Sequence, residues 1–361
     1  MVGGPMKAPV RSVPVPPSLL GVAARVETRL AQVLADERDR WLELDGDLAA
    51  PYDSLTRLVM AAGKRLRPAF CHWGFVAAGG EPGTDAVVDA GAAFEFLQAF
   101  ALIHDDVMDG SATRRGSETA HLEFAAVHEA SQWRGEARRY GDGVAILVGD
   151  LAHVYADVLV AGCPPQARAV WDELRIELNV GQYLDVLGTA RGDTDYAGAR
   201  RIARYKSGKY TIERPLHVGA ALAGRLPELS EPLSRYGDPL GEAFQLRDDV
   251  LGAFGDEATT GKPVGDDLRE GKPTPLLAVA AGRVGAAQAA LLSRVGAPGL
   301  GGDEIVALQD LLVDTGAVAT IEAAIEELTV EAVAAIERAP VTDEARWALV
   351  ELAHYVAWRE R

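Results

Sequence analysis

The sequence predicts an all-α fold, a single-domain bundle of helices, on three observations. Apolar residues recur at helical spacing along almost the whole 361-residue chain, and no stretch shows the alternation of a strand. Alanine, leucine and valine dominate the apolar residues while aromatic residues make up only 6% of the chain, a mixture that favours helix over sheet. We find no internal repeat and no interdomain linker, so one domain accounts for the chain.

The elements follow from that periodicity. A proline-rich segment, residues 1–17, is interpreted as a flexible arm before the domain at 18–361. Residues 84–109 are apolar on nearly every side, which places that helix at the centre of the bundle. Residues 110–143 are polar and are predicted to form a lid or partner-contacting loop with some helix, and residues 255–272 form a second loop. Helices are expected at 19–44, 52–62, 67–78, 84–109, 144–161, 165–190, 196–223 (with a break near Gly208), 229–253, 275–295, 303–313, 317–337 and 343–360.

Composition excludes several classes of protein. The formal net charge of −17 argues against nucleic acid as a partner, because such binding needs a basic face. No run of eighteen apolar residues without charge is present, so no membrane span is expected, and the N-terminus lacks the apolar core of a secretory signal. The two cysteines, Cys71 and Cys163, lie far apart and fit a reduced, cytoplasmic setting.

The first candidate site is an aspartate cluster at the end of the most apolar helix. Asp105 and Asp109 are four residues apart, so on a helix they lie about 40° apart in azimuth and ~6 Å apart along the axis. Two neighbouring carboxylates repel each other unless a cation lies between them, and hard oxygen ligands suit Mg²⁺. Asp106 points to an adjacent face and is assigned a supporting role. A solvated helix end is the alternative, but an acidic triplet following a buried helix is costly and indicates function.

A second cluster, Asp248 and Asp249, follows another apolar helix. Asp248 is the better candidate ligand, and the position one turn later on its face is Gly252. With fewer carboxylates than the first cluster, this site is expected to hold one metal ion and the first cluster two.

Basic residues surround the two clusters. Lys64, Arg65 and Arg67 lie in a turn at a helix start, where free N–H groups favour phosphate. Further cations are Arg114, Arg115, Lys206, Lys209, Lys262 and Lys272. Guanidinium groups bind phosphate in a bidentate manner. Each cation alone is most often a solvated surface charge, but their placement around paired aspartates predicts a site for phosphorylated substrates.

Seven motifs in order then resemble those of the trans-prenyltransferases, the head-to-tail isoprenyl diphosphate synthases of the polyprenyl synthetase family. They are GKRLRP, DDVMD, TRRG, GQYLD, YKSGKY, FQLRDD and TGKP. One DDxxD is shared with terpene cyclases and is weak alone, whereas seven ordered motifs are specific. The resemblance covers residues 50–280 by motif, and it implies the isoprenoid synthase fold, antiparallel helices around a central cavity. It also implies a homodimer.

The resemblance implies a role for each matching residue. Asp105, Asp109 and Asp248 would ligate three Mg²⁺ ions, with Asp106, Gln182, Asp185 and Asp249 in support. Arg114, Lys206 and Lys262 would bind the allylic diphosphate. Lys64, Arg67, Gln98 and Arg115 would hold isopentenyl diphosphate, and Lys272 is a further candidate. The backbone carbonyl and hydroxyl of Ser207, with Gln245, would face the developing allylic cation, and Lys206 is counted with them as a catalytic residue through its hold on the diphosphate. The chain departs from the family pattern at Gly252, which stands where a third aspartate is usual, and at Ser207, which replaces threonine and keeps its hydroxyl.

The implied reaction is condensation of isopentenyl diphosphate with an allylic prenyl diphosphate, with diphosphate released. Phe100 and Ala101 lie one turn before Asp105, where bulk in the family forms the floor of the product pocket. One aromatic residue with a small neighbour resembles synthases that stop at twenty carbons, so geranylgeranyl diphosphate is the favoured product and farnesyl diphosphate the alternative. A class I terpene cyclase and the partner subunit of a heteromeric synthase are weaker alternatives, because the second basic group and most aspartates are intact. His104 and His121 are interpreted as packing or hydrogen-bonding residues.

Overall fold

The computed structural model describes residues 13–61, 63–191, 195–255 and 264–359. Most of the predicted arm, and Lys262, lie outside these residues. The helices of the N-terminal half are α1 (Pro17–Leu42), η1 (Gly46–Leu48), α2 (Ala49–Met60), α3 (Leu66–Ala77), α4 (Asp85–Asp109), α5 (Ala120–Ala130), α6 (Ala137–Val160) and α7 (Pro165–Arg191). Those of the C-terminal half are α8 (Tyr196–Ala203), the π-helix η2 (Arg204–Glu213), α9 (Arg214–Leu222), α10 (Leu226–Phe254), α12 (Asp266–Glu270), α13 (Pro275–Ala281), α14 (Ala286–Leu292), α15 (Gly302–Asp314), α16 (Ala317–Arg338) and α17 (Asp343–Trp358).

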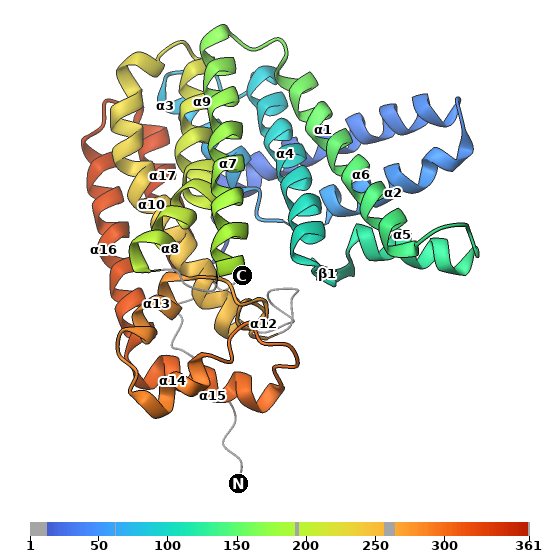
Figure 1. Cartoon of the computed structure of the whole chain (residues 1–361). Helices are drawn as coiled ribbons and strands as arrows, with labels where there is room; N and C mark the ends of the chain where they lie inside the picture. The colour runs from blue at the N-terminus through green and yellow to red at the C-terminus, as the bar shows by residue number, and fades with distance from the viewer. Residues whose placement is uncertain (1–12, 62, 192–194, 256–263, 360–361) are drawn as a thin grey trace.

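The all-α prediction is confirmed, since the strands in the described residues are one hairpin of two-residue strands, β1 (Thr113–Arg114) and β2 (Ser117–Glu118). Long, steeply inclined helices form the body of the molecule, and α2, α5 and part of α1 extend to one side of it (Figure 1). Helix α4 contacts α6, α3 and α1. It therefore has the central place that its continuous apolar sequence predicts.

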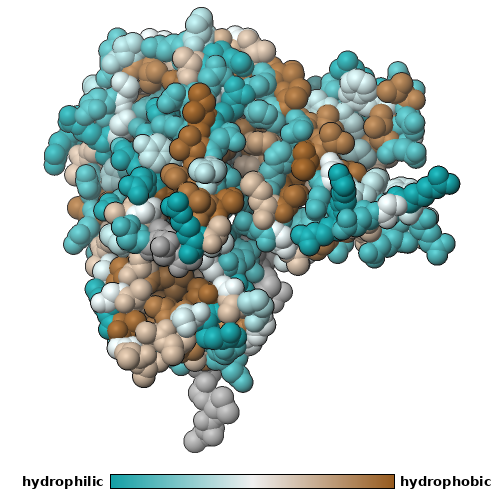
Figure 2. Space-filling model, in the orientation of Figure 1, coloured by the Kyte–Doolittle hydropathy of each residue, from teal (hydrophilic) through white to brown (hydrophobic). Residues whose placement is uncertain are grey.

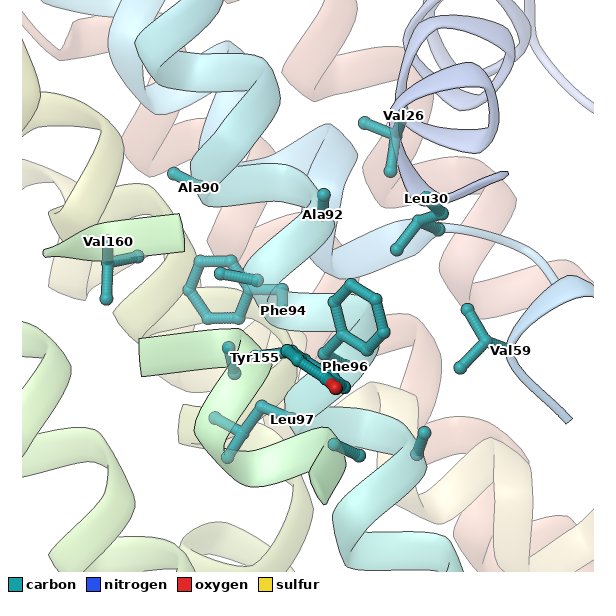
Figure 3. Packing of buried hydrophobic residues seen from close by; sticks show 14 of the residues in the cluster. Val26, Leu30, Val59, Ala90, Ala92, Phe94, Phe96, Leu97, Tyr155 and Val160 are labelled. Carbon is teal, nitrogen blue, oxygen red and sulfur yellow. The ribbon is translucent and has the colours of Figure 1, made fainter. Parts of the chain in front are cut away.

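Aromatic side chains hold α4 in this position. Phe94 packs edge-on against Trp171 of α7, with ring centroids 5.2 Å apart, and Phe96 lies 5.8 Å from Tyr155 of α6. Figure 3 shows Phe94, Phe96 and Tyr155 meeting between the helices, with Leu97 below them. Because these rings are buried, the position of the C-terminal end of α4, which carries the first aspartates, is set by core packing.

Three predicted elements are wrong in detail. Helix α6 begins at Ala137 rather than 144, because Gly141 is a site of close helix contact and not a helix breaker: a Cβ there would lie 2.1 Å from the His121 carbonyl oxygen of α5. The predicted loop 110–143 therefore contains the hairpin, all of α5 and the start of α6. The predicted helix 275–295 is divided into α13 and α14 around Gly282.

The predicted helix 196–223 is helical over this whole range, but its type changes along the chain, from the α-helix α8 through the π-helix η2 to the α-helix α9. A π-helix widens the turn and is frequent at functional sites. The segment carries Lys206 and Ser207, so the irregular turn lies where the sequence predicts reactive chemistry.

By length and composition alone, α4 and α6 in the described chain are apolar enough to cross a membrane. Most of the apolar stretch of α4 is buried inside the bundle, so its apolar character is that of a core helix.

Two glycines bring α3 and α9 into backbone contact. A Cβ at Gly219 would lie 2.0 Å from the Cys71 carbonyl oxygen, and one at Gly74 would lie 2.3 Å from that of Leu216. Because α3 starts at the basic turn and α9 continues from η2, this contact sets the distance between two parts of the predicted site.

Replacing Gly219 with Ala should therefore force α3 and α9 apart and lower the free energy of unfolding by about 1–3 kcal/mol. Urea denaturation followed by circular dichroism measures this. Gly21→Ala on α1 is the matched control, since no atom lies within 4 Å of its added Cβ; it should leave stability unchanged or raise it by ~0.5–1 kcal/mol. Equal stability of the two variants would contradict the close contact.

Candidate active site

A cavity of about 840 Å³ lies between the start of α3, the C-terminal part of α4, α7, η2, α10 and α12. Most of the predicted site residues line it: Lys64, Arg67, Gln98, Ala101, Asp105, Arg114, Arg115, Gln182, Asp185, Lys206, Ser207, Gln245, Asp248, Asp249 and Lys272. Residues up to 208 positions apart in sequence thus share one space, which is the arrangement expected for a substrate pocket.

Asp105 is buried and lies at the centre of a network joining α4, α7 and η2. Its Oδ1 accepts hydrogen bonds from Gln182 Nε2 at 2.9 Å and from Lys206 Nζ at 3.0 Å. The same ammonium donates to Asp185 Oδ2 at 2.6 Å. Gly181 makes this possible, because a Cβ there would lie 2.4 Å from the Lys206 backbone nitrogen. The DDVMD, GQYLD and YKSGKY motifs therefore meet at one point.

Asp106 has a different partner. Its Oδ1 accepts hydrogen bonds from Nε and Nη2 of Arg114, with the Nε distance 2.9 Å. The Arg114 guanidinium also lies 3.7 Å from Asp105 Oδ2. The hairpin that carries Arg114 is thereby held against the end of α4, with its cation beside both carboxylates.

Asp109, one turn beyond Asp105, faces Lys272 rather than Lys206. The Lys272 Nζ lies 3.6 Å from Asp109 Oδ2 and 2.6 Å from Glu270 Oε2. Asp109 Oδ2 is buried without a hydrogen-bond donor in the described residues. Lys272 therefore lies on the aspartate side of the cavity.

The two carboxylates of this motif differ in proton affinity. Burial would raise the pKa of Asp105, but the ammonium groups of Lys206 and Lys272 outweigh it and lower that pKa to about 2. Burial and the charge of Asp105 raise the pKa of Asp109 to about 6. Asp105 is thus ionised over the whole physiological pH range, whereas Asp109 holds its proton more tightly, and a nearby cation would favour its ionised form.

The second cluster lies on α10. Asp248 Oδ1 accepts a hydrogen bond from Arg359 Nη2 at 2.5 Å, and the same guanidinium donates to the Phe244 carbonyl at 3.1 Å. Asp249 is deeply buried: its Oδ1 accepts from Gln245 Nε2 at 2.8 Å, while Oδ2 has no donor in the described residues. Burial raises the pKa of Asp249 well above its ordinary value.

These donors suit Mg²⁺. They are carboxylate oxygens, the ligand type that hard divalent cations prefer, and Asp109 and Asp249 each carry a buried oxygen that receives no hydrogen bond from the part of the chain that the structure describes. In the described residues no three acidic, histidine or cysteine side chains are already grouped as a metal site requires. Asp105 and Asp109 instead face the ammonium groups of Lys206 and Lys272, and one or two carboxylates with substrate oxygens are enough for this ion.

A separate cationic region lies around the GKRLRP turn. Arg65 is fully buried, with a left-handed φ of 51°, and its guanidinium pairs with Glu95 of α4 and with Glu27 of α1. A Cβ at Gly63 would lie 3.5 Å from both Arg65 and Arg115 side chains, so the hairpin arginine reaches this turn. Arg65 thus anchors the turn, leaving its neighbours Lys64 and Arg67 to line the cavity.

Arg67 connects this region to the π-helix. Its Nη2 donates to Thr211 Oγ1 at 2.9 Å, and its guanidinium lies 4.3 Å from the centre of the Tyr210 ring. Arg115 Nη1 donates to the Leu58 carbonyl at 2.9 Å. Burial, together with the nearby Arg65 and Arg67, outweighs the charge of Glu95 and lowers the pKa of Arg115. This concentration of positive charge favours an anion.

Ser207 lies in the cavity wall on η2, next to a contact between two glycines. A Cβ at Gly208 would lie 3.0 Å from the Gly241 carbonyl carbon of α10. The backbones of η2 and α10 therefore approach closely, which brings Ser207 and Gln245 into the same wall.

The two residues predicted to limit product length are placed differently. Ala101 lines the cavity, whereas Phe100 does not. The Phe100 ring packs between His104 and His153, with centroids 4.6 and 4.7 Å away. The role of Phe100 as a floor stays a prediction, and its packing explains how a bulky side chain could be held rigid there.

The sequence analysis missed several residues of the site. Glu95 and Arg359 were not singled out, and Arg65 was noted only as a phosphate-binding cation. A charged residue inside an apolar run, as Glu95 is in 84–109, is the signal that could have identified the first. Arg359 is third from the end of the chain, and nothing in its local sequence indicates a buried partner on α10.

Comparisons with known proteins agree with this geometry. The polyprenyl synthetase family model matches residues 50–299. The chain is 32% identical to a geranylfarnesyl diphosphate synthase from Aeropyrum pernix over 84% of this chain and 92% of that protein. It superposes with a TM-score of 0.89 and 36% identity on a geranylgeranyl pyrophosphate synthase from Corynebacterium glutamicum complexed with isoprenyl diphosphate and magnesium, covering 94% of this chain and 99% of that one.

A polyprenyl synthase from Caulobacter crescentus, complexed with calcium and isoprenyl diphosphate, is also similar, with a TM-score of 0.81 and 28% identity over 98% of this chain and 100% of that one. Two of these relatives are solved with a divalent cation, in accord with the carboxylates described above. The chain belongs to the polyprenyl synthetase family and is a prenyltransferase that elongates isoprenyl chains.

Proposed function

We propose that the chain condenses isopentenyl diphosphate with an allylic prenyl diphosphate and releases geranylgeranyl diphosphate. The observation that carries this proposal is one cavity with two anion sites of different kinds. One is the aspartate side, suited to metal-bound diphosphate, and the other is the metal-independent cationic region around Arg67 and Arg115. An enzyme with a single diphosphate substrate needs only the first.

Asp105 and Asp109 would hold two Mg²⁺ ions and Asp248 a third, with Asp106, Gln182, Asp185 and Asp249 orienting them. Bound Mg²⁺ supplies positive charge that stabilises diphosphate as a leaving group. Arg114 and Lys206 lie beside the same carboxylates and would bind the allylic diphosphate from the protein side. Lys262 is proposed for the same diphosphate from sequence alone.

Isopentenyl diphosphate would be held on the other side of the cavity, near the GKRLRP turn. The residues proposed for this are Lys64, Arg67, Gln98 and Arg115, which all line the cavity. Arg67 and Arg115 already have backbone or hydroxyl acceptors that fix their orientation. Such preorganised donors lose little freedom when an anion binds. The position of Lys272 beside Asp109 favours a role at the allylic diphosphate for that residue.

The proposed reaction begins with cleavage of the allylic carbon–oxygen bond, whose electron pair leaves with diphosphate. The alkene of isopentenyl diphosphate then forms a carbon–carbon bond with the allylic cation. The adduct loses a proton to the released diphosphate, which gives a new trans double bond. The backbone carbonyl and hydroxyl oxygens of Ser207, with Gln245, would face the cation, while Lys206 holds the leaving diphosphate. The Gln245 amide nitrogen is already bonded to Asp249, which leaves its carbonyl oxygen.

Product analysis with isopentenyl diphosphate and each of the C5, C10 and C15 allylic starters tests the proposal. We expect geranylgeranyl diphosphate as the end product, loss of turnover with a chelator, and recovery with Mg²⁺. Turnover of an allylic diphosphate without isopentenyl diphosphate would indicate a cyclase, and inactivity of the purified chain would indicate a partner subunit. A C15 end product would overturn the assigned chain length and leave the reaction class intact.

Phe100→Ala should lengthen the product by one or more C5 units, because it removes the aromatic ring held between His104 and His153. Chromatography of dephosphorylated products measures this, with Phe100→Leu as the control that keeps apolar bulk. Unchanged product length in the alanine variant would remove Phe100 from the role of floor.

We also propose a homodimer that uses an exposed apolar face of α6 and α7. Val154 and Val158 lie one turn apart on α6 with exposed fractions of 55% and 64%, and Leu147 is 63% exposed. Brown side chains run along α7 and α6 on the face shown in Figure 2. Large aliphatic side chains gathered on one face indicate a protein interface, and a second copy of this chain is the occupant we propose.

Val154→Glu should convert the dimer to a monomer, because it buries a charge in the proposed interface. Sedimentation velocity measures the change. Val330→Glu is the matched control, since Val330 on α16 is 64% exposed, at least as exposed as Val154 at 55%, and lies outside this face. A monomeric wild-type chain, or a dimer that persists in the variant, would contradict the proposal.

We place the protein in the cytoplasm. Cys71 and Cys163 are both free thiols in the structure, and Cys71 is buried. Absence of a disulfide between the cysteines suits a reducing compartment.

A further inference from the structure

Gly252 is the point at which the second aspartate motif departs from its usual pattern. It lies one helical turn after Asp248 on α10, on the same face, and both residues line the cavity. A side chain at this position would therefore point into the region of the second aspartates.

That space is filled by another residue. A Cβ at Gly252 would lie 1.8 Å from Asp267 Oδ2, 2.5 Å from its Cγ and 3.2 Å from its Oδ1. All three carboxyl atoms of Asp267, a residue of α12, thus lie where the side-chain atoms of an aspartate at 252 would be. No residue larger than glycine fits at 252 while Asp267 keeps this position.

A second carboxylate of this cavity, that of Asp249, favours a cation nearby. Asp249, 4% exposed and lining the same cavity, carries an Oδ2 that no hydrogen-bond donor reaches in the described residues. A buried carboxylate oxygen without a donor is costly unless a cation approaches it. Asp267 lines the same cavity as Asp249.

Asp267 also faces the first aspartate motif. The Lys272 Nζ lies 4.0 Å from Asp267 Oδ1 and 3.6 Å from Asp109 Oδ2, so one ammonium group spans the two acidic clusters. Asp267 is therefore on the cavity side of α12, at the boundary between the clusters.

We propose that Asp267 supplies the third carboxylate of the second aspartate site, from α12, in the space that Gly252 leaves open. This inference rests on the proposed Mg²⁺-dependent binding of diphosphate. The second site then draws on two elements, Asp248 and Asp249 on α10 and Asp267 on α12. Because these three carboxylates are not grouped as a bound ion requires in the described structure, they would close on the ion when Mg²⁺ and diphosphate bind, with α12 docked against the end of α10. Glycine is then required at position 252 to leave room for Asp267, and its presence does not mean that the second site has lost its function.

Variants that remove the carboxylate from position 267, or move it to position 252, test the proposal. Isothermal titration calorimetry measures binding of inorganic diphosphate at a fixed Mg²⁺ concentration, independently of turnover. Asp267→Asn, which keeps the shape of the side chain, should weaken this binding by roughly 10- to 100-fold. Gly252→Asp should also weaken it, because the new side chain collides with Asp267. The double variant Gly252→Asp/Asp267→Ala returns the carboxylate to α10 and should recover binding to within about threefold of wild type.

Asp310→Ala, an exposed aspartate on α15, is the control and should bind as wild type does. Thermal unfolding of each variant separates weak binding from loss of fold, and recovery in the double variant excludes a general defect of α12. Wild-type affinity in Asp267→Asn, or losses that simply add in the double variant, would overturn the inference while leaving the proposed function intact. Failure of the wild-type chain to bind diphosphate in a Mg²⁺-dependent manner would overturn both.

Discussion

The structure depends on the presence of several carboxylates at the end of a buried helix. Asp105, Asp106 and Asp109 close α4, whose other residues are almost all apolar and packed. Such a concentration of negative charge is destabilising unless cations surround it. Lys206, Arg114 and Lys272 do so from three different elements, and each contacts a different aspartate most closely. The charge balance of the helix end therefore also brings η2, the hairpin and the segment after α12 to the cavity.

Close backbone contacts make this charge balance geometrically possible. Gly181 lets η2 approach α7, and Gly208 lets it approach α10. Gly219 does the same for α3 and α9. A larger residue at any of these positions would force the backbones apart; at Gly181 this would move the backbone of Lys206, whose ammonium bonds to both Asp105 and Asp185. The glycines thus position charged groups even though they carry no functional atoms.

The cavity also explains why two diphosphates need not compete for one site. Among the described residues, no donor reaches one carboxylate oxygen of Asp109 and one of Asp249 on the aspartate side, which suits a metal ion, while in the region around Arg65 the negative charge of Glu95 is already neutralised. Arg65 is anchored by that pair, so the cations beside it remain directed toward the cavity wall. Arg359 has a comparable anchoring role at the second aspartate cluster. Its side chain is fully buried, its guanidinium packs over the Phe244 ring, and it donates a hydrogen bond to Asp248.

Much of this could be predicted from the sequence, because helical periodicity and short-range motif spacing are local properties. The all-α fold, the central place of residues 84–109 and the membership in the family followed from them. The position of α5 and the early start of α6 did not, because Gly141 has the same local signature whether it ends a helix or allows another helix to approach. The partners of Asp248 and the carboxylate beside Gly252 are separated from them by 111 and 15 residues, and no local pattern specifies such pairs. The sequence by itself determined the charged groups that lie in motifs, since motif identity is local. Only the tertiary structure added Glu95, Arg359 and Asp267 and decided which groups meet, since packing sets distances between remote residues.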